Sequence, residues 1–376
     1  MKIVLTGGGT GGHIYPGLAI AEALAADAAC APLEVLFVGT RDRLEAQIVP
    51  KAGVPIAFVH AAPLSRVFSA RDPFAIVRTL ALGAAGFFES LSVLHRARPD
   101  VLIATGGYVA LPVVAALRFV RFLRRTRAKT ALLEPNAVAG ITNRLLAPLV
   151  DEVWYALAPA RSLRGNERVV GMPVRSSMRR PLDAAAARAS LGLAPERKTI
   201  VVMGGSQGAA SINEAFASLV QTGVPADWQF LAIAGARDYT ALGARLAPFP
   251  AATVVPYLDD PRPAFAAADL VVARAGASTL GELAATATPA LLIPYPYATG
   301  DHQRRNAERY AASAAARVLF DRDLSAARLR AELVEMLGEP VLRELRDAAR
   351  SLADVDPRAT IVARVKALSA SNRGLP

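Results

Sequence analysis

Residues 1–26 read MKIVLTGGGTGGHIYPGLAIAEALAA. The apolar run Ile3–Thr6 predicts a short buried strand, and the pattern over Pro16–Ala26 predicts a helix. The glycines between them permit positive φ angles and let an anionic ligand reach backbone N–H groups at the start of the helix. A strand, a glycine turn and a helix in this order are typical of the first βαβ unit of a parallel sheet.

Apolar runs of strand length alternate with helical patterns along the rest of the chain. In the first half, strands are expected at Val35–Val38, Val101–Ala104, Thr130–Leu133 and Val153–Tyr155. The alternation then starts again with a strand, a glycine turn and a helix, and the second set of elements is Thr199–Met203, Ala210–Val220, Phe230–Ala234, Thr253–Pro256, Leu270–Ala273 and Ala290–Ile293. Two such series predict an α/β protein with two Rossmann-like, doubly wound parallel sheets. Because ligands bind at the carboxyl ends of parallel strands, the functional site is expected in the cleft between the two sheets.

The composition predicts a folded protein with an anionic partner. Apolar residues make up 53% of the 376 residues, and the formal net charge is +11. Such a charge indicates nucleic acid, an acidic lipid surface or a phosphorylated substrate, although a codon bias towards Arg and Ala would also produce it. No nucleic acid partner is expected, because no recognised binding motif accompanies the charge. The apolar run at the N-terminus is too short for a signal peptide, and glycines and a proline interrupt Val101–Leu117, so we expect a cytosolic chain with no membrane-spanning segment.

Two glycine-rich turns follow expected strands and contain the first candidate residues. The turn Gly7–Gly12 ends at His13, whose neutral imidazole could take a proton from a hydroxyl or could merely cap the helix. The turn Gly204–Ala209 contains Ser206 and Gln207. Its N–H groups and the serine hydroxyl could bind a diphosphate, or its glycines could serve only tight strand–helix packing. It lacks the Gly-Lys-Ser/Thr ending of a P-loop, which argues against hydrolysis of a nucleoside triphosphate.

Two further motifs follow expected strands in the second half of the chain. Arg274–Glu282 leads into a helix, where Glu282 could accept hydrogen bonds from a ribose diol or could be only a favourable charge near the helix start. In Asp301–Asn306, Gln303 and Asn306 are three residues apart and share a helix face. Their amides suit sugar hydroxyls, and a solvated polar helix start explains the pattern equally.

Three motifs in the first half, Thr105–Tyr108, Glu134–Asn136 and Gly140–Asn143, would line the same cleft, although ordinary turn chemistry explains them about as well. No Asp-x-Asp pair stands at a strand end to bind Mg²⁺ against a diphosphate, and no Cys/His cluster indicates zinc. We therefore expect no metal and no other cofactor. Charge on a leaving group would instead be stabilised by helix N-termini and arginine.

Taken together and in order, these motifs resemble those of glycosyltransferase family 28. The resemblance covers Lys2 to about Ala363 and is most specific at Gly8–Ala19 and in the combination of Gly204–Ala209, Gly276–Glu282 and Asp301–Asn306. It implies the GT-B fold, in which two Rossmann domains are followed by helices that cross back to the first. The expected parts are an acceptor- and membrane-binding domain at 1–165, a UDP-GlcNAc-binding domain at 166–350 and a returning helix at 351–376.

Members of this family are inverting transferases of peptidoglycan synthesis. The resemblance implies transfer of GlcNAc from UDP-GlcNAc to the C4 hydroxyl of MurNAc in undecaprenyl-pyrophosphoryl-MurNAc-pentapeptide (lipid I), which gives lipid II without a catalytic metal. It implies that His13 is the general base and that His13, Asn136 and Glu282 act at the reacting centre. The other implied substrate contacts are Thr10, Gly11, Gly12, Tyr108, Arg175, Ser206, Gln207, Tyr257, Leu258, Arg274, Ala277, Ser278, Gln303 and Asn306.

The resemblance assigns parts of the substrates to some of these residues. Arg175 and Ser206 would contact the diphosphate, and Glu282 would contact the ribose. The backbone at Ala277 and the amide of Gln303 would contact the sugar. Asn136 would contact the donor sugar or the acceptor, and uracil would lie against the backbone near Tyr257 and Leu258.

A lipid-linked acceptor implies contact with a membrane. Phe68–Leu94 and Leu117–Lys129 combine apolar residues with cations, which suits an anionic leaflet, although core helices with basic faces would look the same. The resemblance implies a peripheral protein at the cytoplasmic face of the inner membrane, with cell-wall synthesis and division proteins as further partners. The alternatives are a GT-B transferase for another lipid acceptor, a non-catalytic sugar-nucleotide-binding scaffold and an epimerase of the same fold family.

Overall fold

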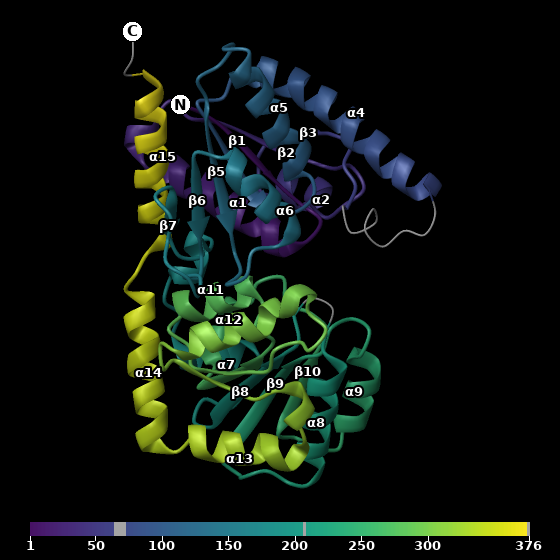
Figure 1. The fold of residues 1–376 in the computed structure, drawn as a ribbon. Helices are drawn as coiled ribbons and strands as arrows, with labels where there is room; N and C mark the ends of the chain where they lie inside the picture. The colour runs from purple at the N-terminus through teal and green to yellow at the C-terminus, as the bar shows by residue number, and fades with distance from the viewer. Residues whose placement is uncertain (64–72, 206–207, 374–376) are drawn as a thin grey trace. The chain divides into compact units, whose positions relative to one another are not determined.

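The computed structural model of the chain describes residues 1–63, 73–205 and 208–373. They form two compact units, one of Met1–Ser176 with Asp356–Pro376 and the other of Ser177–Val355. Each unit is built on one parallel sheet, with seven strands in the first and six in the second (Figure 1). The predicted α/β class with two doubly wound parallel sheets is therefore confirmed.

The first sheet has the strand order β3-β2-β1-β4-β5-β6-β7. Its strands are β1 (Lys2–Gly7), β2 (Glu34–Gly39), β3 (Ile56–Phe58), β4 (Val101–Gly106), β5 (Lys129–Glu134), β6 (Glu152–Tyr155) and β7 (Glu167–Val169). The direction of strand succession reverses between β1 and β4, where Thr6 pairs with Ala104. The carboxyl ends of these two strands therefore form the topological switch point, the usual place for a ligand in such a sheet.

Helices cover both faces of the first sheet. They are α1 (Gly11–Ala26), α2 (Glu45–Lys51), α4 (Pro73–Ala97), α5 (Ala110–Phe122), α6 (Ile141–Leu146) and α15 (Pro357–Arg373). Successive side chains of a strand point to opposite faces, so β1 contributes to two cores. Ile3 and Leu5 belong to the core with residues of α1 and α15, and Val4 belongs to the core with residues of α4 and α5.

The C-terminal helix α15 packs along α1 in the first unit. Arg364 of α15 forms an ion pair with Glu152 at the start of β6, and that carboxylate also accepts a hydrogen bond from Trp154 Nε1 at 2.7 Å. Lys366 Nζ lies 2.8 Å from Asp27 Oδ2 just after α1. These contacts attach the last helix of the chain to its first sheet.

One described helix segment, Ile76–Ala97 of α4, is long and apolar enough by length and composition to cross a membrane. The sequence analysis expected no such segment. Apolar core helices of soluble proteins meet the same criterion. Such core helices are mostly buried, whereas only 22% of the most apolar 18-residue stretch of this segment is buried. The segment is therefore an apolar helix with an exposed face.

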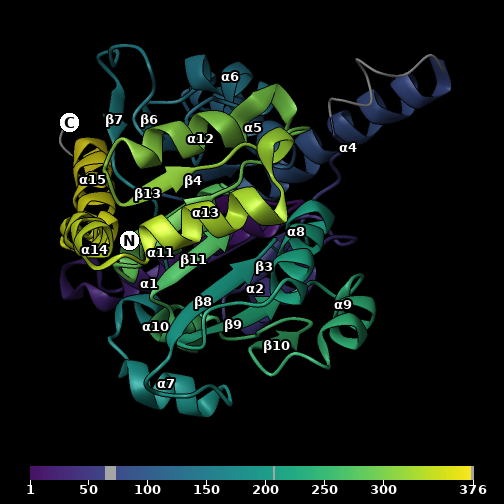
Figure 2. The same ribbon diagram turned by 90° about the horizontal axis from the view of Figure 1, so that it is seen from below.

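The second sheet has the order β10-β9-β8-β11-β12-β13, which repeats the arrangement of the first six strands of the other sheet. Its strands are β8 (Lys198–Met203), β9 (Trp228–Ile233), β10 (Ala252–Val255), β11 (Leu270–Ala273), β12 (Ala290–Leu292) and β13 (Ala316–Val318). The helices are α7 (Ala184–Ser190), α8 (Ala210–Gln221), α9 (Tyr239–Leu246), α10 (Arg262–Ala267), α11 (Ala277–Ala285), α12 (His302–Ala311), α13 (Ala326–Met336) and α14 (Glu339–Ala353). One core joins the sheet to α8, α13 and α14, and α13 lies beside α8 (Figure 2).

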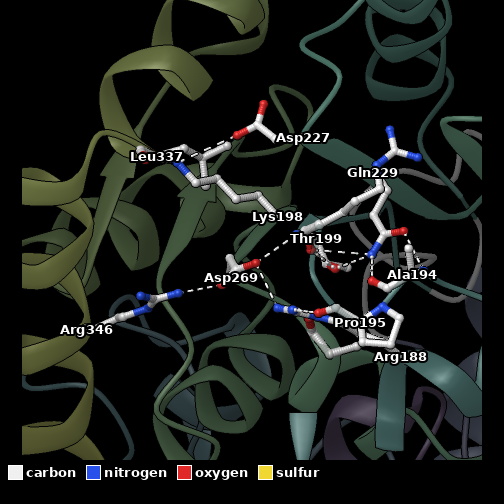
Figure 3. Close-up of polar contacts among 12 residues, drawn as sticks. Arg188, Ala194, Pro195, Lys198, Thr199, Asp227, Gln229, Asp269, Leu337 and Arg346 are labelled. Atoms are coloured by element: carbon white, nitrogen blue, oxygen red, sulfur yellow. Dashed lines mark hydrogen bonds and ion pairs between the residues drawn. The ribbon is translucent and has the colours of Figure 1, made fainter. Parts of the chain in front are cut away.

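A carboxylate organises the amino edge of the second sheet. Asp269, directly before β11, accepts a hydrogen bond from Thr199 N at 2.8 Å and forms an ion pair with Arg188 Nη2 at 2.9 Å. Arg346 of α14 pairs with its other oxygen (Figure 3). The side chain of Asp269 is only 12% exposed. One buried anion thus joins α7 and α14 to neighbouring strands.

The predicted strands of both halves are confirmed, with ends shifted by one or two residues. The structure adds β3, β7 and β13, each of three residues and each at the edge of a sheet. Strands this short show no periodicity along the sequence, so only their neighbours reveal them. The first helix was predicted to begin at Pro16, but it begins earlier, at Gly11, and Pro16 lies inside it.

Candidate active site

The first glycine turn lies at the switch point of the first sheet, between β1 and α1. Gly9 has a φ of +85°, which favours glycine, and the ring of Tyr108 lies directly over it, 3.1 Å from where a Cβ would stand. Beneath the turn, the fully buried Glu45 accepts hydrogen bonds from Gly9 N at 3.1 Å and from Thr40 Oγ1 at 2.6 Å. A carboxylate from α2 therefore sets the path of the glycine turn.

His13 lies in the first turn of α1, and its ring is oriented by the end of β4. Its Nδ1 is 2.9 Å from the carbonyl oxygen of Thr105, and the Thr105 hydroxyl donates to the His13 carbonyl at 2.6 Å. Since a carbonyl only accepts, Nδ1 carries the proton and Nε2 carries the lone pair of the neutral ring. Gly106 makes this approach possible, because a Cβ there would lie 2.8 Å from Nδ1.

Glu134 at the end of β5 organises the next loop. Its carboxylate accepts hydrogen bonds from Asn136 N at 2.9 Å, Asn136 Nδ2 at 3.2 Å and Asn143 Nδ2 at 2.7 Å. Burial raises the pKa of Glu134, while these hydrogen bonds oppose the rise. The loop that carries Asn136 is thus folded around one buried carboxyl group.

Two further predicted residues of the first unit lie near the start of α1. Thr10 is the N-cap residue of α1 but makes no side-chain capping bond, and it is exposed. Arg175 is exposed, with its guanidinium 5.5 Å from the ring centroid of Tyr15 on α1. The predicted Gly11 and Gly12 form the first residues of this helix, where backbone N–H groups suit an anion.

The second glycine turn is only partly described. Ser206 and Gln207 lie outside the described residues. Gly204 and Gly208 flank them. At both, a Cβ would come within 2.4 Å of backbone atoms. The close approach of Gly204 to Ala209 N, and of Gly208 to the Ala234 carbonyl after β9, therefore requires glycine at these two positions, whatever ligand the turn binds.

Helix α11 follows β11 and carries three of the predicted residues. Ala277 is its first residue, and Ser278 and Glu282 follow in its first two turns. Ala277 and Glu282 are half-buried, and the buried hydroxyl of Ser278 has no hydrogen-bond partner in the described part of the chain. A hydroxyl of this kind costs free energy unless something pairs with it, as a ligand at the start of the helix would.

Arg274, directly after β11, is 9% exposed and its guanidinium binds protein groups. It pairs with Asp321 Oδ1 at 2.5 Å and donates to Ser211 Oγ at 2.8 Å. On α12, the predicted Gln303 accepts a hydrogen bond from Tyr295 N at 3.0 Å. Asn306 is fully buried and donates to the Ala275 carbonyl at 3.1 Å. The polar groups of α12 therefore bind the segments that follow β11 and β12.

The structure gathers the predicted residues at the carboxyl edges of the two sheets. His13, Tyr108 and Asn136 follow β1, β4 and β5, and Arg274, Ala277 and Gln303 follow β11 and β12, which are neighbouring strands in each sheet. Tyr257 and Leu258 follow β10, on the far side of β8 from β11, with Tyr257 52% exposed. Within the described part of the chain, no group of three His, Cys, Asp or Glu residues could bind a metal ion.

Sequence reasoning missed the residues that support the site from below. Glu45 lies outside the motifs and contacts Gly9, and Ser211 and Asp321 likewise contact Arg274, so only the folded chain shows these partners. Thr105 was noted only as part of a turn, whereas its carbonyl sets the tautomer of His13. Glu45 lies six residues after β2 ends at Gly39, and no local pattern there marks it as a buried carboxylate.

Comparison with known proteins gives matches over nearly the whole chain. Residues 3–155 match the glycosyltransferase family 28 N-terminal domain, and residues 199–357 match the family 28 C-terminal domain. A UDP-N-acetylglucosamine–N-acetylmuramyl-(pentapeptide) pyrophosphoryl-undecaprenol N-acetylglucosamine transferase of Moorella thermoacetica is 39% identical over 366 residues, 94% of this chain and 95% of that one. The protein of the same name from Salinibacter ruber is 39% identical, and the match covers 98% of this chain and 96% of that one. The crystal structure of Acinetobacter baumannii MurG is similar with a TM-score of 0.74 and 25% identity, covering 98% of this chain and 100% of that one.

Proposed function

The chain belongs to glycosyltransferase family 28, and from this premise we propose that it transfers GlcNAc from UDP-GlcNAc to the MurNAc of lipid I. The product is lipid II, a precursor of peptidoglycan. One observation carries this assignment: relatives at 39% identity over nearly the full chain are named for this reaction. The resemblance found in the sequence motifs and the fold of both units support it.

The donor is assigned to the carboxyl edge of the second sheet. Glu282 would bind the ribose, and the unpaired Ser278 hydroxyl and the Ala277 backbone would meet the donor at the start of α11. Gln303 would contact sugar hydroxyls through its amide nitrogen, because Tyr295 N already occupies its oxygen. Uracil would lie near Tyr257 and Leu258, and Ser206 and Gln207 would contact the diphosphate.

The acceptor hydroxyl is assigned to the first unit, with His13 as its base. The carbonyl of Thr105 orients the ring so that Nε2 is the basic nitrogen. Nε2 takes the proton from O4 of MurNAc as O4 attacks the anomeric carbon, and the bond from that carbon to UDP breaks with inversion. Tyr108 and Asn136 flank His13 at the same edge and would orient the acceptor sugar.

Charge develops on the UDP oxygen as the glycosidic bond breaks. Backbone N–H groups at helix starts, together with the exposed guanidinium of Arg175, would stabilise this charge. Thr10, with a hydroxyl that does not cap its own helix, would contribute a hydrogen bond near the diphosphate of either substrate. The arrangement relies on fixed dipoles and cations of the chain.

The lipid acceptor places the protein at a membrane surface, and α4 and α5 supply the contact. Phe74 and Phe122 are 84% and 81% exposed, and Val77, Leu80 and Phe88 are also exposed. Arg118, Arg124 and Arg125 on or just after α5 are exposed beside them. Apolar side chains beside cations favour an anionic leaflet, so we place the protein peripherally at the cytoplasmic face of the inner membrane, within reach of cell-wall synthesis and division proteins. Equal binding to neutral and anionic vesicles would contradict the role of the arginines.

A transfer assay tests the proposal directly. Purified protein is incubated with radiolabelled UDP-GlcNAc and a lipid I analogue, with UDP-Gal and UDP-Glc as competing donors. Labelled lipid II from UDP-GlcNAc is the expected result. Transfer to another lipid, or nucleotide binding without turnover, would identify a different transferase or a scaffold.

His13→Ala tests the assignment of the base. It should lower kcat by about 10²- to 10⁴-fold, the usual contribution of a positioned base, with little change in the Kd for UDP-GlcNAc. The matched control is His95→Ala, which replaces an exposed histidine of α4. An unchanged kcat in His13→Ala would remove this residue from the base role.

A further inference from the structure

The side chain of Arg274 contacts three other segments at the carboxyl edge of the second sheet. Its Nη1 lies 2.5 Å from Asp321 Oδ1 and 3.1 Å from the carbonyl oxygen of Ile293. Its Nη2 lies 2.8 Å from Ser211 Oγ. Arg274 itself follows β11, Ile293 follows β12, Ser211 begins α8 after β8, and Asp321 follows β13. One side chain therefore connects the ends of β8, β11, β12 and β13.

The contacts of Arg274 close into a ring with Asp321 and Ser211. The Ser211 hydroxyl donates to Asp321 Oδ1 at 2.8 Å, so this oxygen accepts from both residues. The side chains of Arg274 and Asp321 are 10% and 18% exposed. A buried guanidinium needs a counter-charge, and the carboxylate of Asp321 is the one that the structure pairs with it.

The ring also determines where α12 lies. The guanidinium of Arg274 is 5.5 Å from the ring centroid of Tyr295, and Tyr295 N donates to Gln303 Oε1. Asn306, one turn further along α12, donates to the carbonyl of Ala275, the residue after Arg274. The side-chain amides of Gln303 and Asn306 are therefore hydrogen-bonded to Tyr295, over which the guanidinium of Arg274 lies, and to Ala275, the residue after Arg274.

We propose that Asp321 is a positioning residue for the sugar nucleotide and that it acts through Arg274. Asp321 neutralises the buried guanidinium and fixes it against Ser211 and the end of β12. Arg274 in turn fixes Tyr295 and the α12 amides in the geometry that binds the donor. Arg274 thus serves the donor by position, although the motif that contains it had indicated direct contact.

This inference rests on the proposed donor site, and it makes a distinct claim about affinity. An ordered site binds more tightly because less conformational freedom is lost when the ligand arrives. Loss of the Asp321 carboxylate should therefore raise the Kd and KM for UDP-GlcNAc. It should leave kcat at saturating donor nearly unchanged, because Asp321 touches neither the base nor the reacting atoms.

The experiment compares Asp321→Ala and Asp321→Asn with the wild type in the full-length protein. The Kd for UDP-GlcNAc is measured by calorimetry, and KM and kcat are measured in the transfer assay. Asp323→Ala is the matched control, since Asp323 belongs to the same short helix, is 55% exposed and, among the residues that the structure describes, forms an ion pair with Arg322 alone. Unfolding curves of all variants show how much each loses in stability.

For Asp321→Ala we expect the Kd to rise about tenfold or more, which corresponds to the loss of a hydrogen bond to a charged group. Asp321→Asn should give a smaller rise, because its oxygen still accepts from Ser211 and Arg274. Asp323→Ala should match the wild type. A loss of stability in Asp321→Ala with an unchanged Kd would reduce Asp321 to a structural role and overturn the inference.

Two further outcomes are decisive. If Asp321→Ala does not fold, Asp321→Asn decides alone, and a Kd equal to that of the wild type overturns the inference. If the wild type itself fails to bind UDP-GlcNAc, the proposed function fails and this inference falls with it. The wild-type measurement thus separates failure of the function from failure of the positioning role.

Discussion

A carboxylate lies at the centre of a polar network at one edge of the second sheet, and a guanidinium lies at the centre of another network at the opposite edge. At the amino edge, the carboxylate of Asp269 binds two arginines, one from α7 and one from α14. At the carboxyl edge, the guanidinium of Arg274 binds carbonyls, a hydroxyl and a carboxylate. The first network joins helices to the sheet, whereas the second joins the loops that carry the predicted donor residues. The same chemistry of a buried ion therefore supports the fold at one edge and the site at the other.

The first sheet shows which part of the amino-edge network both units share. Asp100, directly before β4, accepts a hydrogen bond from Lys2 N at 2.8 Å, just as Asp269 accepts one from Thr199 N at 2.8 Å. Each aspartate also donates its own N–H to the carbonyl of that partner residue, at 2.8 Å in both units. These backbone bonds join the same two strands in each sheet. Around Asp269, Arg188 and Arg346 also attach α7 and α14 to the sheet.

The largest effect is expected from Asp269→Asn. The substitution leaves the guanidinium groups of Arg188 and Arg346, whose side chains are 13% and 35% exposed, facing a neutral amide, which should lower the free energy of unfolding by about 3 kcal/mol. Urea denaturation measures the change, with Asp100→Asn as the matched control, expected to lose less than about 1 kcal/mol. The Kd for UDP-GlcNAc should not change in the folded variant. Equal losses in the two variants would show that the arginines add nothing to the shared backbone bonds.

A smaller effect is expected at the carboxyl edge of the first sheet, from Glu45→Gln. The amide nitrogen cannot accept a hydrogen bond, so either Gly9 N or Thr40 N loses its partner and the variant should lose about 2 kcal/mol. Because the glycine turn carries Thr10 and leads to His13, kcat should fall as well. Thermal unfolding and the transfer assay measure both changes. Glu34→Gln, at an exposed ion pair with Lys2, is the control that should change neither.

The smallest effect concerns Glu167 at the amino end of the edge strand β7. Its hydrogen bonds with Arg161 lower the pKa of Glu167 from 4.5 to about 2. A carboxyl group with a depressed folded-state pKa stabilises the fold above its unfolded pKa, and this stability is lost as the pH falls from about 4.5 to about 2. Because Arg161 is 45% exposed, solvent screens the pair and we expect about 1 kcal/mol.

Glu167→Gln should therefore flatten the acid dependence of the unfolding midpoint in this range. Differential scanning calorimetry from pH 6 to about pH 2 gives the comparison with the wild type. If the unfolding midpoint falls equally with pH in the wild type and in Glu167→Gln, other carboxyl groups cause the acid sensitivity.

The sequence predicted the long strands and the glycine turns for a physical reason. Buried parallel strands are continuous apolar runs, and the turns that follow them need glycine to avoid backbone clashes, as Gly107 and Gly208 do here. The motif residues of each unit follow neighbouring strands, because the carboxyl ends of parallel strands meet at one edge. The edge strands β3, β7 and β13 were not predicted from the sequence, because their pairing partners, not their own residues, define them.

Periodicity and turn chemistry are local properties, so the amino-acid sequence was enough to predict the α/β class, the succession of strands and the elements on which His13, Glu282 and Gln303 lie. The groups that act on these residues appear only once the chain is folded. The carbonyl that orients His13 lies 92 residues away, and the carboxylate that pairs with Arg274 lies 47 residues away. Hydrogen bonds over such separations depend on how strands are ordered in a sheet, and no local pattern of residues encodes that order.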